Sequence, residues 1–265
     1  MEAHNYPAPL TAKNAGTVGQ TRQTDAYRLV SSGASEKIFV LAFDYRGFGS
    51  STGSPTEDGL ITDAISVIKW AMEVANVSPN RIVLVAQSLG TGLASAAAAH
   101  FVNSQPKIEF AGIVLCATFT ESSSVFMDFR LKGLIAPLAP LRYFPTLEAW
   151  FKRSIKDTWK TSDRLMTLVK KSDRLRLTLV HATSDQVISW RNCNDLFYTT
   201  VNAADERKLT NAEIDEGKET RHLGDGGWTC CWVAGDKVIR QNVLKHGGKS
   251  YVPLLIETAH RLHRA

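Results

Sequence analysis

The sequence has no apolar run long enough to cross a membrane and no leader of the secretory type. Its opening stretch, MEAHNYPAPLTAKNAG, contains no hydrophobic core of signal-peptide length. No later window of the 265 residues reaches the roughly 18 consecutive apolar residues that a membrane-spanning helix needs. We therefore expect a cytoplasmic or membrane-associated protein whose chain carries neither a signal peptide nor a transmembrane segment.

Cysteine is scarce and poorly spaced for cross-linking or metal binding. The four residues are Cys116, Cys193, Cys230 and Cys231. They are too few and too scattered for a disulfide framework, and the adjacent pair lacks the two-residue spacer of a metal knuckle. We expect reduced thiols, no metal and no cofactor.

The charges are nearly balanced: 31 Lys and Arg residues face 26 Asp and Glu residues, a net charge of +5, with no run of five or more like charges. Such a mild excess indicates no nucleic-acid partner and is compatible with peripheral contact with an anionic membrane surface. With 44% hydrophobic residues the chain can bury one sizeable core, so residues 1–265 are predicted to form a single domain.

Short apolar runs alternate with helical patterns along most of the chain. The runs KIFVLAF, RIVLVA, FAGIVLCATF and LRLTLVHA predict strands over residues 37–43, 81–86, 110–119 and 175–182. Apolar residues at helical spacing predict helices over residues 55–74, 89–103 and 162–171. Strands that alternate with helices form parallel sheets, and continuous apolar strands are covered on both faces. The predicted fold class is α/β, a mostly parallel sheet flanked by helices.

Two regions interrupt this alternation. Residues 119–165 are rich in Phe, Leu, Pro and Met. They form either a connector with ordinary core contacts or a cap or lid insertion over a site for a hydrophobic substrate. Residues 202–237 are polar and contain glycine, which predicts a surface excursion. The last segment, from Lys237 onward, predicts a final strand, a Gly-Gly turn and a closing helix.

Ser88 lies where the apolar run RIVLVA gives way to an alanine-rich helical pattern. Small residues flank it in Ala86-Gln87-Ser88-Leu89-Gly90, a variant of the G-x-S-x-G elbow with alanine in place of the first glycine. Small flanking residues let such a strained turn close and expose the serine hydroxyl as a nucleophile. The alternative is a serine that only caps the following helix.

Asp185 follows the predicted strand of residues 175–182, at the carboxyl edge where parallel sheets build their sites. A carboxylate there can orient a catalytic imidazole and stabilise its charged form. The alternative is a local cap before Ile188-Ser189-Trp190. His181, within the same strand, is interpreted as a packed histidine.

Five segments in order carry a family resemblance: FDYRGFGSSTGSPTEDGLITDA, VAQSLGTG, DTWKTSDRL, LTLVHATSDQVISW and VIRQNVLKHGG. From about Asn14 to Pro253, the chain resembles the α/β-hydrolase superfamily and, within it, the alpha/beta-hydrolase-domain-containing 12-like branch of lysophosphatidylserine and monoacylglycerol lipases. The resemblance implies that Ser88 is the nucleophile and Asp185 the acid. It also implies lipid-ester substrates and an endoplasmic-reticulum-like membrane association.

The chain departs from the family at the oxyanion segment. Relatives carry His-Gly-Asn-Ala-Gly, whereas this chain has Ala12-Lys13-Asn14-Ala15-Gly16. Asn14 and Ala15 remain as candidate oxyanion residues, together with the backbone N–H of Leu89 after the nucleophile. Loss of one donor typically lowers the rate by about 10² to 10³.

The family's strand before this segment lies between the strands matching residues 37–43 and 81–86. Here the corresponding stretch, MEAHNYPAPLT, has two prolines, which argue against a central strand over residues 6–10. The family's first strands are missing as well. We therefore expect an N-terminally truncated form or an imperfect gene model, with a gap or a re-paired centre in the sheet.

The family's base histidine follows a Gly-Gly pair, but this chain has Gly247-Gly248-Lys249. His246 lies in the same loop and is the base that we predict, with His260 and His263 as alternatives. The sequence thus predicts a Ser-His-Asp ester hydrolase. A thioesterase or peptidase of the same fold, and a catalytically impaired hydrolase-like protein, remain the alternatives.

Overall fold

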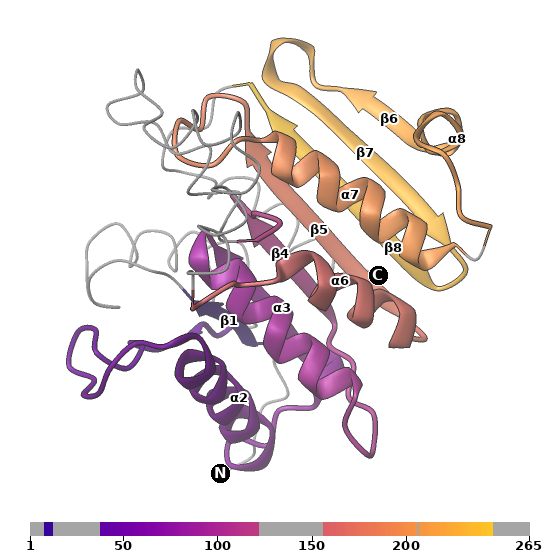
Figure 1. Cartoon of the computed structure of the whole chain (residues 1–265). Coiled ribbons are helices and arrows are strands. Elements are labelled where there is room, and N and C mark those ends of the chain that lie inside the picture. Colours follow the sequence, from indigo (N-terminus) through magenta and orange to yellow (C-terminus); the bar gives the residue numbers. More distant parts are fainter. Residues whose placement is uncertain (1–7, 13–37, 122–155, 206, 246–265) are drawn as a thin grey trace.

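The computed structural model describes residues 8–12, 38–121, 156–205 and 207–245 (Figure 1). Its centre is an eight-stranded sheet in the order β2-β1-β3-β4-β5-β8-β7-β6. The six strands from β2 to β8 in this order run parallel, and β7 and β6 each pair antiparallel with the preceding strand. The strands are Ala8–Ala12 (β1), Leu41–Ala42 (β2), Ile82–Gln87 (β3), Gly112–Cys116 (β4), Leu175–Ala182 (β5), Glu219–His222 (β6), Gly227–Ala234 (β7) and Lys237–Leu244 (β8).

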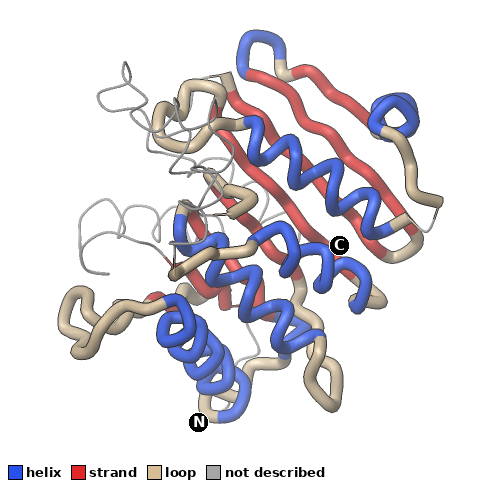
Figure 2. Tube along the Cα trace, in the orientation of Figure 1, coloured by secondary structure: helices blue, strands red, loops and turns tan. Residues whose placement is uncertain are grey.

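Four longer helices lie on the same face of this sheet, the face toward the viewer in Figures 1 and 2. The helices are Glu57–Glu73 (α2), Leu89–Val102 (α3), Thr161–Lys171 (α6), Arg191–Ala204 (α7) and the short Asn211–Gly217 (α8), with 3-10 turns at Pro79–Arg81 (η1) and Gly224–Gly226 (η3). The α/β class and the mostly parallel sheet flanked by helices are therefore confirmed.

Both faces of the central strands are buried. The side chains of Ile82 and Leu84 point into the large core beneath the helices. The alternating residues Val83 and Val85 join Val114 in a second buried cluster, as the two-residue period of a strand requires. Nearly continuous apolar runs such as IVLVA are typical of strands covered on both sides.

The prediction that proline would keep residues 6–10 out of the centre of the sheet is wrong for β1. This strand lies between β2 and β3, pairing Leu10 with Leu41 and Pro9 with Val83. Proline removes one backbone donor but keeps its carbonyl and an extended φ. The strand β2 pairs only with Leu10 and Thr11 of β1, the two residues that follow Pro9. The sheet therefore has no gap between β2 and β3.

Residues 202–237 are more regular than the predicted surface excursion. The helix α8 and the strands β6 and β7 lie in this region, and β7 pairs with β8 along its whole length. The four residues of β6, at the edge of the sheet, are all exposed and contribute to the polar composition of this segment. It therefore extends the sheet rather than leaving it.

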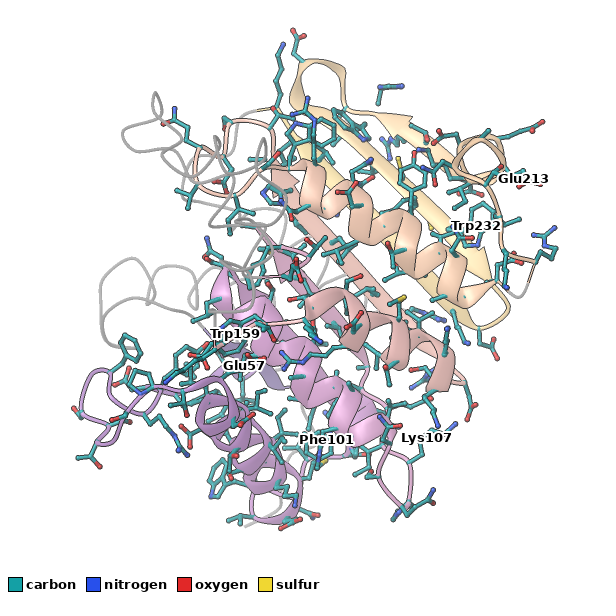
Figure 3. The ribbon with its side chains drawn as sticks, in the orientation of Figure 1. Glu57, Phe101, Lys107, Trp159, Glu213 and Trp232 are labelled. Carbon is teal, nitrogen blue, oxygen red and sulfur yellow. The ribbon has the colours of Figure 1, made fainter. Side chains whose placement is uncertain are left out.

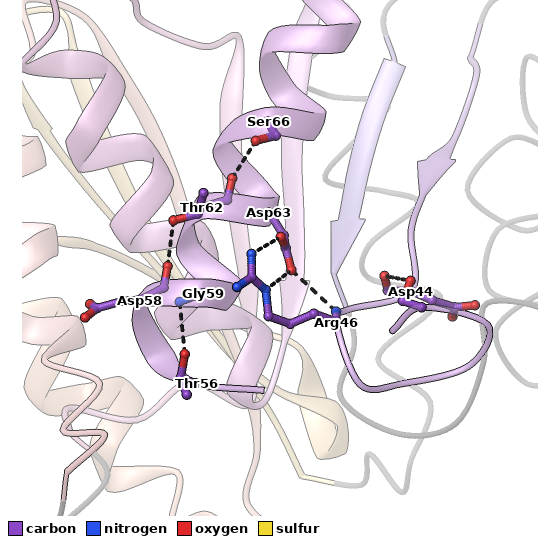
Figure 4. A network of polar contacts seen from close by, with 9 residues as sticks. Asp44, Arg46, Thr56, Asp58, Gly59, Thr62, Asp63 and Ser66 are labelled. Atoms are coloured by element: carbon purple, nitrogen blue, oxygen red, sulfur yellow. Dashed lines mark hydrogen bonds and ion pairs between the residues drawn. The ribbon is translucent and has the colours of Figure 1, made fainter. Parts of the chain in front are cut away.

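A bidentate ion pair joins the loop after β2 to α2 (Figure 4). The Nε and Nη2 atoms of Arg46 donate to the two carboxylate oxygens of Asp63, at 2.8 and 2.6 Å. The hydroxyl of Thr56 accepts from the backbone N–H of Gly59 and caps the start of α2. The predicted helix over residues 55–74 thus starts two residues later than expected.

The insertion 119–165 falls largely on residues 122–155, and the expected Gly-Gly turn and closing helix fall on residues 246–265; both stretches lie outside the described residues. The single-domain prediction for residues 1–265 also stays a prediction. Within the described part, no helix is both long and apolar enough to cross a membrane.

Candidate active site

Ser88 occupies the sharp turn between β3 and α3. Its backbone has φ 54° and ψ −128°, a combination that L-amino acids adopt rarely and at a cost of about 1–3 kcal/mol. The Ser88 hydroxyl makes no capping hydrogen bond to α3, so the alternative of a plain helix-capping serine is wrong. The residue is half-buried, and the strained turn is the conformation that the elbow interpretation requires.

The surroundings hold this turn firmly. The Ser88 N–H donates to the carbonyl of Cys116 at the end of β4, at 2.9 Å. The Ser88 carbonyl accepts from both the backbone N–H and the hydroxyl of Thr91, at 2.8 and 2.6 Å. Thr91 is fully buried, so these bonds are shielded from water. Leu89, the predicted oxyanion donor, is the first residue of α3.

Asp185 lies in the loop after β5, at the same carboxyl edge of the sheet as Ser88, with β4 between their two strands. Its Oδ1 accepts from the backbone N–H groups of Val187 and Ile188, at 2.8 and 3.0 Å. These bonds agree with the alternative of a local cap. They also direct one carboxylate oxygen toward the backbone, which fixes the side chain's orientation, as a catalytic acid requires.

His181 is a packed strand histidine, as expected. Its side chain is fully buried, and Nε2 lies 2.9 Å from the Ile188 carbonyl and 3.7 Å from Asp185 Oδ2. Burial lowers the pKa of His181, while the Ile188 carbonyl and the Asp185 carboxylate oppose that shift. The imidazole is therefore neutral near pH 7, and it braces the turn that carries Asp185.

The chain leaves β8 beside the Asp185 loop. The hydroxyl of Thr183 donates to the carbonyl of Lys245 at 2.9 Å, and the Thr183 N–H donates to the carbonyl of Leu244 at 2.7 Å. Lys245 is followed by His246, the predicted base. His246 lies outside the described residues, as do Asn14 and Ala15. The structure thus places Ser88, Leu89 and Asp185 and leaves the other three predicted site residues as predictions.

Sequence reasoning missed a buried charge network near the start of α3. Glu57, the first residue of α2, has a buried side chain that pairs with Arg164 of α6. Trp159, just before α6, donates its backbone N–H to Glu57 Oε2 at 3.0 Å. These partners are about a hundred residues apart, so no local pattern could have identified them.

The likeness to known proteins agrees with this arrangement. The sequence model described as the alpha/beta hydrolase family matches residues 21–213. An uncharacterized protein, YfhR of Salmonella typhi, is 30% identical over 64% of this chain and 52% of its own length. The lysophosphatidylserine lipase ABHD12 of Xenopus tropicalis is 32% identical over 56% of this chain and 35% of its own length. The chain thus spans about a third to a half of these curated relatives.

Solved structures share the fold at low sequence identity. An alpha-beta hydrolase from Vibrio vulnificus superposes with a TM-score of 0.61 at 14% identity, covering 97% of this chain and 73% of that one. A monoacylglycerol lipase from Paleococcus ferrophilus gives 0.52 at 16% identity, covering 97% and 96%. At such identities these neighbours establish the architecture alone.

Proposed function

This chain belongs to the alpha/beta hydrolase family, and from that premise we propose that it is a serine ester hydrolase with Ser88 as its nucleophile. The strained backbone of Ser88, held between β3 and α3 with its hydroxyl unused by the helix, is the observation that carries the proposal. A hydroxyl that caps a helix does not need φ 54°, whereas a nucleophile at a strand-to-helix elbow projects from such a strained turn.

The mechanism follows from the proposed roles. Ser88 Oγ attacks the ester carbonyl while its proton passes to a histidine, for which we propose His246 because the chain leaves β8 beside Asp185. The Leu89 N–H, with the segment of Asn14 and Ala15, stabilises the negative oxygen of the tetrahedral intermediate. The histidine then protonates the departing alcohol, and a water activated by the same histidine releases the acid from the acyl-enzyme.

Asp185 orients the histidine in this scheme. Its Oδ1 already accepts two backbone N–H groups, so the carboxylate cannot rotate without losing both. A fixed carboxylate selects one imidazole tautomer and stabilises the imidazolium that forms during acylation. The buried and neutral His181 supports that turn through the contact of its Nε2 atom with the Ile188 carbonyl, and it takes no proton from Ser88.

For the substrate we propose a lipid ester, a monoacylglycerol or a lysophospholipid. The names of the ABHD12 relatives support this class. The apolar composition of residues 119–165, proposed as a cap over the acyl chain, and the net charge of +5, suited to peripheral contact with anionic lipid, point the same way.

Reaction of the folded protein with a fluorophosphonate probe tests the nucleophile. We expect labelling of the wild type and of the control Ser66→Ala, an exposed serine on α2, and no labelling of Ser88→Ala. Intact-protein and peptide mass spectrometry locate the adduct. A folded wild type that takes up no probe would refute the proposal and favour the catalytically impaired alternative, to which Lys249 in the family's histidine position points.

A further inference from the structure

Trp159 has a backbone conformation that is unusual for a large residue. Its φ is 44°, in the left-handed region that bulky side chains almost never occupy, and its side chain is buried. Ser88 and Ala117, which follow β3 and β4, also have positive φ, at 54° and 50°. Such strain persists only where neighbouring groups hold it in place, and it gathers at functional sites.

A buried carboxylate holds Trp159 in this conformation. Glu57 Oε2 accepts the Trp159 N–H, and Glu57 Oε1 forms an ion pair with Nη2 of Arg164. The side chains of Glu57 and Arg164 are 10% and 21% exposed, so water screens the pair only weakly. On the other side, Asp157 Oδ1 accepts the backbone N–H of Glu57 at 3.1 Å. We call Glu57, Trp159 and Arg164 the Trp159 clamp. Glu57 and Trp159 are labelled in Figure 3.

The Trp159 clamp contacts the first turns of α3 at Gly92. A Cβ atom added to Gly92 would lie 3.0 Å from Cε3 of Trp159, tighter than most Cβ contacts, so glycine lets the indole ring lie close to the helix backbone. Arg164 Nη1 also donates to the Gly92 carbonyl at 3.4 Å. Gly92 lies one turn beyond Ser88, and the clamp therefore touches the helix that begins at the proposed nucleophile.

We propose that the Trp159 clamp is a positioning unit for the Ser88 elbow. It fixes the first turn of α3, and with it the Leu89 N–H and the Thr91 donors that hold the Ser88 carbonyl. This proposal rests on the proposed role of Ser88 as a nucleophile. A helix start displaced by as little as about 1 Å can lower a rate by about 10². Trp159, Glu57 and Arg164 act through the elbow and are not catalytic residues themselves.

Trp232 of β7 provides a matched control. It is buried to a similar degree, 8% exposed against 5% for Trp159, and it too packs on a glycine, since a Cβ on Gly217 would lie 2.8 Å from its Cζ3. It lies near α8, away from α3 (Figure 3). A Trp-to-Ala change costs packing at either position, so a difference between them reports on positioning rather than on stability.

The experiment compares Trp159→Ala, Trp159→Phe and Trp232→Ala in the full chain, well below their melting temperatures. One readout is the second-order rate constant for fluorophosphonate labelling of Ser88. We expect it to fall at least about tenfold in Trp159→Ala, to recover in part in Trp159→Phe, and to change less than about twofold in Trp232→Ala. The other readout is hydrogen exchange of the peptide spanning residues 82–93, which should become faster only in the Trp159 variants.

The two readouts separate the proposals. If the wild type labels and the Trp159 and Trp232 variants label at equal rates, the positioning role is overturned while the nucleophile stands. If the wild type does not label, the proposed function fails, and hydrogen exchange alone decides whether Trp159 fixes the start of α3. Should Trp159→Ala not fold, Trp159→Phe and Glu57→Gln carry the same comparison, and unchanged exchange in both overturns the proposal.

Discussion

The ion pair between Glu57 and Arg164 can be compared with an exposed pair in the same chain. Replacing Glu57 with glutamine keeps the shape of the side chain but removes its charge. The amide oxygen can still accept the Trp159 N–H, while the guanidinium of Arg164 is left in a mostly buried site without its counter-charge.

Removing one partner of a fully buried pair costs about 3–5 kcal/mol, because the remaining charge is uncompensated. The exposures of 10% and 21% and the surviving hydrogen bond place Glu57→Gln below that range, at about 2–3 kcal/mol. For a chain of this size, that loss lowers the melting temperature by about 4–12 °C.

The control is Asp173→Asn, which removes the charge from a pair with Lys107. The two atoms of that pair lie 2.6 Å apart, but the side chains are 36% and 82% exposed. Exposed pairs contribute about 0–1 kcal/mol. Urea unfolding followed by tryptophan fluorescence measures both variants. Equal losses for Glu57→Gln and Asp173→Asn would refute the reasoning, because burial would then make no difference to the two pairs.

Two further predictions concern buried titratable groups. Burial lowers the pKa of His181 from 6.5, so below about pH 6.5 the unfolded chain binds a proton that the folded protein does not. The free energy of unfolding should fall as the pH drops through that range, and urea titrations at several pH values should show a shallower fall in His181→Gln. Burial also raises the pKa of Cys193 to about 12, so iodoacetamide near pH 8 should modify it only after unfolding, as peptide mass spectrometry can show; modification of the folded protein would contradict this.

The sequence predicted the fold well where its apolar residues form a continuous run or recur at helical spacing. The strand over residues 175–182 has the predicted bounds, because a continuous apolar run must be buried on both faces. The predicted helix over residues 55–74 corresponds to α2, because the helical spacing of its apolar residues leaves one face that must be buried. The strand β6 was missed because its sequence carries no such pattern. The four residues of β6 are all exposed and carry no hydrophobic signal, and only pairing with β7 makes them a strand.

Only those parts of the candidate site that are formed by residues close together in the sequence could be predicted. The turn at Ser88 and the loop at Asp185 each follow a strand within a few residues, so their motifs are visible in the sequence. The Trp159 clamp joins residues from three distant segments, and the strain at Trp159 depends on a carboxylate 102 positions away. Neither residue type nor spacing encodes such a contact.

The hairpin of β6 and β7 also bears on solubility. Without the hairpin, β8 would present a row of unpaired backbone N–H and C=O groups to other molecules. Such an edge can pair with a strand of another chain and lead to aggregation. With the hairpin, the sheet ends on this side at β6, a strand of four exposed residues that include Glu219, Arg221 and His222. A short charged edge is a poor template for a second chain, so the hairpin protects this edge of the folded protein from intermolecular sheet growth.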